Sequence, residues 1–196
     1  MVAALAMPGL ISSTKDAITA SRWKKAYSSV NQAYTSVLAD KGGTIANSCT
    51  DAECLNALLT PYFKIYKSCT SANYATCWTV SSLFFETPAY AALPPAGYTA
   101  FTSNPDSVTI LVDGTVLAYN FISTNCTDTT KTGLADCGVI TVDIDGPKGK
   151  HVAGEDLFAL HIQATGLKPF GSRGDNYYDK CDNSDKTGCG FAYLSK

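Results

Sequence analysis

The sequence predicts an α+β protein in which a long N-terminal helix packs on an antiparallel sheet of about four strands. In the first forty residues, apolar side chains recur every three or four positions, which is the spacing of one face of a helix. In contrast, residues 107–196 contain short apolar runs bounded by Gly, Asp and Asn, which are typical of strands. A helix followed by a run of strands is the element order of an α+β fold, with the helix covering one face of the sheet.

The N-terminal region, residues 1–40, combines an apolar start with an amphipathic continuation. Pro8 interrupts the apolar run 1–11, and we expect a kink or a helix start there, because proline lacks the amide hydrogen. Ser12-Ser13-Thr14 favours a fresh helix from about residue 13, which Gly42-Gly43 should end. The apolar stripe consists of Trp23, Ala26, Tyr27, Val30, Ala33, Tyr34, Val37 and Leu38.

Residues 41–196 are long enough to form one globular head with a core of its own. Its first part, 41–106, is expected to be mostly loop, because residues 71–106 are rich in Ala, Tyr and Pro, and four prolines and Gly97 interrupt them after residue 87. Within it the pattern predicts a short helix over 51–60, capped by Thr50 or Asp51, and an irregular or helical turn over 62–67. Residues 78–85 are a possible strand.

The second part of the head, 107–196, carries the expected sheet. An Asp-Gly pair between two apolar runs predicts a β-hairpin, because this pair favours the tight turn that joins antiparallel strands. The predicted strands are 108–112 and 116–122, which form the hairpin, then 137–144 and 157–162, with 191–194 as a possible last strand.

The composition excludes some classes of function. Charged residues make up 16% of the chain, against an average of about 25% for soluble domains. The formal net charge is −2 and no strongly basic block occurs. Nucleic-acid binding through a basic patch is therefore not expected, because such binding depends on many contacts to phosphate groups.

The eight cysteines predict disulfide bonds in an oxidising compartment. None lies in a C-x-x-C pair and the chain has only two histidines, so a zinc site has little support. Eight cysteines allow about 105 pairings, and we favour neighbours in sequence because short loops close at the lowest cost in entropy. The alternative is a set of reduced, buried thiols in a cytosolic protein. The expected pairs are Cys49–Cys54, Cys69–Cys77, Cys126–Cys137 and Cys181–Cys189.

The turn between the strands 137–144 and 157–162 holds the strongest candidate for a metal site. Asp143 and Asp145 offer alternate carboxylates and Glu155 or Asp156 would complete the shell, which suits calcium. The spacing does not fit an EF-hand loop. The alternative is a tight connection whose aspartates cap backbone N–H groups. His151 and His161 flank the turn and are expected to be a surface and a strand histidine rather than a ligand pair.

No pattern of catalytic residues stands out, so we do not expect an enzyme. Ser172 lacks the G-x-S-x-G context of a nucleophile elbow, and the chain has no H-E-x-x-H, P-loop or dinucleotide-binding motif. Asn125-Cys126-Thr127 matches the N-glycosylation pattern, which a chain rich in Asn and Thr also contains by chance.

No complete export signal is visible in the sequence. The apolar run 1–11 is shorter than the roughly 20 residues that span a bilayer, and it has no basic segment before it. Either the chain is cytosolic, or it begins partway through a longer apolar segment. The cysteines favour the second interpretation.

Three stretches together carry a resemblance to a known family. Residues 2–11, continuing into 23–34, resemble the first helix of bacterial type IV pilin-like proteins, which carry a prepilin-type cleavage and methylation segment. Residues 142–158 resemble the turn D-x-N-G-x-K-G-P-N-x-x-G-x-D-x-F of one branch of that family. The closing residues 187–194 resemble the C-terminal strand of that branch.

The chain also departs from the family. Its leader, its cleavage site and the first half of its helix are absent, so we expect the chain to begin within the last turns of the membrane helix. Asp145 stands where the family turn has Asn, and Lys150-His151 stands where it has Pro-Asn. We therefore carry over no binding role to His151.

The resemblance implies a pilin-like fold and a structural subunit of a type IV pilus-like filament. Such a subunit is anchored in the inner membrane, meets the assembly machinery there, and then polymerises with further copies through its N-terminal helix. The head faces outwards, in an extracellular filament or the periplasm, for adhesion, motility or uptake. The residues expected to belong to the assembly helix are Pro8, Trp23, Tyr27, Val30, Tyr34 and Val37.

Two alternatives from other classes stay open. The chain could be a secretion-system pseudopilin, or a secreted or minor-pilin binding module that recognises a surface or a glycan through loops 86–106 and 163–190. A disulfide-rich hydrolase is a third class, for which we find no acid, base or nucleophile.

Overall fold

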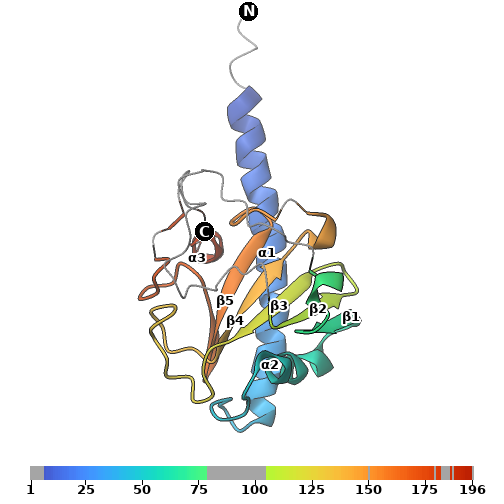
Figure 1. Cartoon of the computed structure of the whole chain (residues 1–196). Helices are drawn as coiled ribbons and strands as arrows, with labels where there is room; N and C mark the ends of the chain where they lie inside the picture. Colours follow the sequence, from blue (N-terminus) through green and yellow to red (C-terminus); the bar gives the residue numbers. More distant parts are fainter. Residues whose placement is uncertain are drawn as a thin grey trace, which may run out of the picture.

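The computed structural model describes residues 7–78, 105–149, 151–178, 180–181, 186 and 188–195, and only the backbone of 7–14 and of Lys148. A long helix runs along one face of an antiparallel sheet, and its N-terminal part projects beyond the sheet (Figure 1). The helices are α1 (Met7–Asp40), α2 (Ala52–Leu59) and α3 (Cys189–Leu194). The strands are β1 (Ile65–Thr70), β2 (Ser107–Leu111), β3 (Val116–Phe121), β4 (Gly138–Asp143), β5 (Leu157–Gln163) and β6 (Gly166–Pro169).

The α+β class is confirmed, but the expected number of about four strands is wrong. The sheet has six strands in the order β1-β2-β3-β4-β5-β6, and every neighbouring pair is antiparallel. The two additional strands, β1 and β6, lie at the edges. Most of β1 is exposed or partly exposed and its register shifts between Ile65 and Lys67, so it lacks the apolar alternation of a half-buried strand. Strand β6 has four residues and contains Gly166 and Pro169, two residue types that are unfavourable inside strands.

The described helix α1 passes through Ser12-Ser13-Thr14 without a break, so a fresh helix start near residue 13 is wrong. Pro8 is the second residue of the described helix α1, in the first turn. Proline is tolerated in a first turn, because the N–H groups there have no partner within the helix. At its other end α1 stops at Gly42-Gly43, as predicted. Gly43 N–H bonds to Leu38 O at 2.7 Å and Gly42 has φ 75°, which together make a Schellman-type end.

The short helix and the hairpin match the sequence expectation. Asp51 caps α2, because its side chain accepts a hydrogen bond from Cys54 N at 2.8 Å. The β2–β3 hairpin turns at Asp113-Gly114, where Gly114 has φ 91° and Asp113 accepts from Thr115 N at 3.1 Å.

Two local expectations are wrong and one lies outside the described chain. The turn expected over 62–67 ends in strand β1 from Ile65 on. The possible strand over 191–194 is part of helix α3, in which Phe191 N–H bonds to Phe170 O at 2.9 Å. A short apolar run does not by itself distinguish a strand from a helix. The possible strand 78–85 lies outside the described residues except for Trp78, which is not in a strand.

The core has two layers, one on each face of the sheet. The layer between the sheet and the helices contains Trp23 of α1, Leu55 of α2 and Phe158 of β5, all at most 2% exposed. The layer on the opposite face contains Leu157 and Phe170, both fully buried. Because both faces are covered, all residues of β2, β4 and most of β5 are buried.

Trp23 is the main contact between α1 and the head. Its ring stacks on Phe158 with the ring centroids 4.4 Å apart, and its Nε1–H donates to Gly190 O of α3 at 2.8 Å. Further along α1, the hydroxyl of Tyr34 donates to Gln163 O at the end of β5. The helix is therefore held to both the sheet and α3.

All four predicted disulfides are confirmed. They are Cys49–Cys54, Cys69–Cys77, Cys126–Cys137 and Cys181–Cys189. Each closes a loop between neighbouring cysteines, which agrees with the entropy argument for short loops. Four disulfides indicate an oxidising compartment, either extracellular or periplasmic.

In the part of the chain that the structure describes, no helix combines the length and the apolar character that crossing a bilayer requires.

Candidate functional site

The turn between β4 and β5 is organised by the carboxylate of Asp143. This residue ends β4, and its Oδ1 accepts hydrogen bonds from the N–H groups of Asp145 at 3.0 Å and Gly146 at 2.8 Å. Gly146 has φ 71°, and a Cβ there would lie 2.3 Å from Gly114 O. Only glycine fits this position, since the turn packs directly on the β2–β3 hairpin. The carboxylate thus holds the turn in the way the capping interpretation expects.

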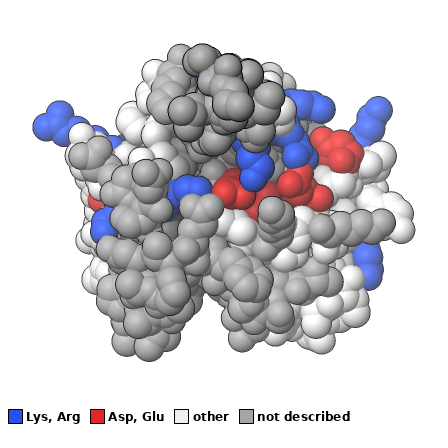
Figure 2. Space-filling model, turned by 90° about the horizontal axis from the view of Figure 1, so that it is seen from above, with Lys and Arg blue, Asp and Glu red and all other residues white. Residues whose placement is uncertain are grey.

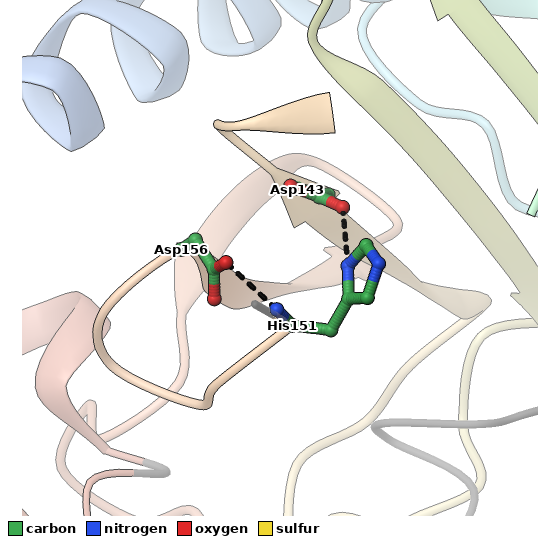
Figure 3. Close-up of side chains that lie close together, drawn as sticks. All are labelled: Asp143, His151 and Asp156. Atoms are coloured by element: carbon green, nitrogen blue, oxygen red, sulfur yellow. Dashed lines mark hydrogen bonds and ion pairs between the residues drawn. The ribbon is translucent and has the colours of Figure 1, made fainter. Parts of the chain in front are cut away.

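Asp156 and His151 complete a small polar group with Asp143 (Figure 3). His151 Nδ1 lies 3.0 Å from Asp143 Oδ2, and His151 N–H donates to Asp156 Oδ2 at 2.7 Å. Val152 N–H donates to the other oxygen of Asp156. One ligand atom from each of Asp143, His151 and Asp156 falls within 4.8 Å of the others.

Burial dominates the electrostatics of this group. Burial raises the pKa of Asp143 to about 6, although the neighbouring His151 and the two N–H groups of the turn act to lower it. The negative charge of Asp156 acts in the same direction as burial. Burial of the Asp143 carboxylate therefore costs free energy, and its hydrogen bonds to backbone N–H groups offset part of that cost.

The four residues predicted to bind calcium do not all converge. Asp143 and Asp156 come together, but Asp145 forms an ion pair with Arg22 of α1, and Glu155 pairs with Lys186 at 3.3 Å. Figure 2 shows acidic and basic side chains next to one another on this side of the molecule, from which α1 projects. Two of the predicted ligands therefore serve as surface ion pairs, which contribute little to stability.

The described donors fit calcium poorly. Calcium takes about six to eight oxygen ligands, whereas this group offers two carboxylates and a ring nitrogen. Both carboxylates already accept hydrogen bonds from backbone N–H groups. The geometry of the described residues thus favours the structural alternative, in which the aspartates hold the turn.

A chelator test separates the two interpretations. We expect the melting temperature of the metal-free protein in excess EDTA to equal that in millimolar calcium, because the aspartates are already satisfied by N–H groups. A bound ion at about 100 times its Kd would add about 2.7 kcal/mol to the stability of the folded state. A calcium-dependent rise of several degrees, lost in an Asp143→Asn variant, would restore the calcium prediction.

A second polar group lies on the face of the sheet away from α1, around His161 of β5. His161 Nδ1 lies 2.7 Å from Asp136 Oδ2, and its Nε2 lies 3.0 Å from Asp175 Oδ2. The side chains of His161, Asp136 and Asp175 are fully buried, with an exposed fraction of 0%. The expectation of a strand histidine is confirmed, but its partners were missed. They are 25 and 14 residues away in sequence, so no local motif marks them.

The residues expected on the assembly helix mostly serve the head. Trp23, Val30, Tyr34 and Val37 are buried in the core, and Tyr27 is partly buried. The described side chains before them, Lys15 to Ile18, are exposed, and that of Ile18 is 55% exposed. The apolar stripe of α1 therefore packs mostly against the core of its own head.

The other motifs have ordinary surroundings. The buried hydroxyl of Ser172 donates to Pro169 O at 2.6 Å, so it holds a turn. Asn125 is exposed in a turn. Of the two expected binding loops, 86–106 lies outside the described residues up to 104, and 163–190 contains β6 and the start of α3.

In comparisons with known proteins, no family model, no curated protein and no solved structure matches this chain.

Proposed function

We propose that the chain is a structural subunit of a type IV pilus-like filament, which polymerises through its N-terminal helix. The observation that supports this best is the division of α1 into two parts. From Trp23 on, the helix is packed into the head, whereas its N-terminal part projects past the sheet without covering it (Figure 1). A helix of 34 residues is about 50 Å long, longer than the head needs for its core.

The projecting part of α1 has the features of a contact for further copies. Ile18 is 55% exposed there, although a large apolar side chain gains free energy when it is buried. Where α1 reaches the head, an open groove between α1 and α3 is lined by Asp16, Ala17, Ala20, Ser21, Lys24 and Tyr193. The small side chains allow another helix to approach closely.

The head suits an exposed position in such a filament. Four disulfides close its loops, and a disulfide of this kind stabilises a fold by about 2–4 kcal/mol. An anchor in the inner membrane before assembly, and the assembly machinery as a partner, belong to the same proposal. The head would serve adhesion, motility or uptake, and a secretion pseudopilin would use the same helix for polymerisation.

The variant Ile18→Lys tests the role of the projecting helix. Filaments are sheared from cells of the source bacterium, and the assembled fraction of the subunit is measured with an antibody against the head. We expect Ile18→Lys to reduce that fraction at least tenfold, because a buried unpaired ammonium costs several kcal/mol and about 1.4 kcal/mol is tenfold. The melting temperature of the isolated variant should stay that of the wild type, since Ile18 is exposed.

Val112→Lys is the matched control, because Val112 is a large apolar residue that is 65% exposed and lies outside α1, at the turn between β2 and β3. It adds the same charge and should assemble like the wild type. The proposal fails if the wild-type protein occurs only as a free monomer. It also fails if Ile18→Lys assembles normally, or if both variants lose assembly equally.

A further inference from the structure

The group around His161 joins three segments that are distant in sequence. His161 lies on β5, Asp136 precedes β4 next to Cys137 of a disulfide, and Asp175 lies in the connection that follows β6. The ring of His161 stacks on Phe170 at 4.2 Å between ring centroids, and Phe170 stacks on Tyr177 at 4.7 Å. We call His161, Asp136 and Asp175 the His161 clasp.

Both ring nitrogens of His161 need a hydrogen. Each lies within hydrogen-bond distance of a carboxylate oxygen, at 2.7 and 3.0 Å. An ionised carboxylate only accepts, and a neutral imidazole donates from one nitrogen alone. The clasp is therefore satisfied when the imidazole is protonated, with one N–H toward each aspartate.

The other contacts of the two aspartates favour their ionised forms. Asp175 accepts N–H groups on both oxygens, from Gly171 at 2.8 Å and from Tyr177 at 2.7 Å. Asp136 accepts from the hydroxyl of Thr132 at 2.5 Å and from Gln163 Nε2 at 3.4 Å. The protons of the clasp thus belong to the histidine.

Burial lowers the pKa of His161, but the hydrogen bonds and charges of Asp136 and Asp175 outweigh it and raise the pKa above its ordinary value of 6.5. Across β5 and β6, His161 pairs with Lys168, whose side chain is exposed, and Tyr177 stacks on Phe170. The two tied segments carry four further titratable groups, all at least partly exposed: Asp128, Lys131, Arg173 and Tyr178. On β4 the residue opposite His161 is the apolar Val139.

We propose that the His161 clasp is a pH-sensitive fastener, which ties the disulfide loop 126–137 and the connection 170–178 to β5 only while His161 is protonated. Loss of the proton leaves one carboxylate facing a ring lone pair, so one of the two segments loses its tie. The pKa is raised in the folded state. The stabilisation is therefore complete below about 6.5, the unfolded value, and is lost as the pH rises through the folded value.

The proposal is independent of filament assembly, and the isolated protein is sufficient to test it. Proton exchange is measured by NMR from about pH 6 to about pH 9 for the amides of Gly171 and Tyr177, in the connection 170–178, and of Gly133, in the loop 126–137. Each rate is divided by the intrinsic rate at that pH. In the wild type we expect the protection of at least one of the two segments to fall at least about tenfold over this range, in step with the titration of the His161 ring. Protection of Val142, in the centre of the sheet, should not change.

Asp136→Asn is the decisive variant, because its amide can donate to a neutral His161 Nδ1 while its oxygen accepts from Gln163. The imidazole then donates from Nε2 to Asp175, and both ties persist without the extra proton. Protection of Gly171 and Tyr177 should become independent of pH. As a control, His151→Gln should keep the wild-type pH profile, since His151 contacts a different aspartate.

Two results would overturn the proposal: a His161 ring that is neutral below about pH 6.5 in the wild type, or wild-type protection that changes in neither segment while the ring titrates. If Asp136→Asn does not fold, the titration of the wild-type ring together with the wild-type exchange still decides the question.

Discussion

Replacing Trp23 by alanine should lower the free energy of unfolding by about 3–5 kcal/mol, the usual cost of removing a large buried aromatic side chain. Trp23 is fully buried and stacks on Phe158, and its Nε1–H satisfies Gly190 O. The alanine variant loses the stack, leaves a cavity between α1 and the sheet, and removes the indole hydrogen bond to a carbonyl of α3. Urea unfolding followed by tryptophan-independent circular dichroism measures the change.

Ile18→Ala on the same helix is the matched control, and it should change stability by about 0.5 kcal/mol or less, because Ile18 is exposed. The comparison tests whether the stripe of α1 is part of the core of the head. A loss below about 1 kcal/mol for Trp23→Ala would show that the helix adds little to the head, against the packing described.

Replacing His161 by leucine should cost about 3–5 kcal/mol at neutral pH, as expected when one partner of a buried charge cluster is removed. Leucine has nearly the volume of the imidazole ring, so the loss does not come from a cavity. It comes from Asp136 and Asp175, which remain buried at the same place without a cation between them. Thermal and urea unfolding of the purified variant provide the measurement.

His151→Leu serves as the control for His161→Leu, because it also removes a contact between a histidine and an aspartate. The side chain of His151 is 12% exposed and its backbone N–H still donates to Asp156, so we expect a loss of about 1–2 kcal/mol. If the two variants had the same free energy of unfolding, the prediction that His161 stabilises the protein by separating two buried carboxylates would be wrong.

Much of the fold follows from interactions that are local in sequence. The stripe from Trp23 to Val37 marks the buried face of α1, and Gly42 and Gly43 mark its end because they adopt positive φ. The Asp113-Gly114 pair marks the β2–β3 hairpin for the same reason. All four disulfides join neighbouring cysteines, so loop entropy alone selects them correctly.

The errors concern segments whose structure depends on distant partners. Strand β1 is mostly exposed and becomes a strand by pairing with β2, about forty residues later in the chain. The apolar run 191–194 fits a strand or a helix equally well. It is part of α3, which contacts Trp23 through Gly190 and Phe170 through Phe191. Propensity is a weak signal for such segments, because tertiary contacts outweigh it.

The polar groups around Asp143 and around His161 also differ in how far the sequence predicted them. The sequence alone identified the turn with Asp143 and Asp156 as the place where carboxylates gather, since these residues flank one connection between strands. Only the tertiary structure directed Asp145 to Arg22 and Glu155 to Lys186, and brought His151 into the group.

By itself, the sequence determined the α+β class, the long helix with its buried stripe, the central hairpin and the disulfides of an oxidising compartment. Each depends on periodicity, turn residues or loop closure over a few positions. Only the tertiary structure decided the edge strands, the helix α3 and the burial of His161 between Asp136 and Asp175. The physical reason is that a buried charge and an edge strand depend on partners that folding brings together from distant parts of the chain.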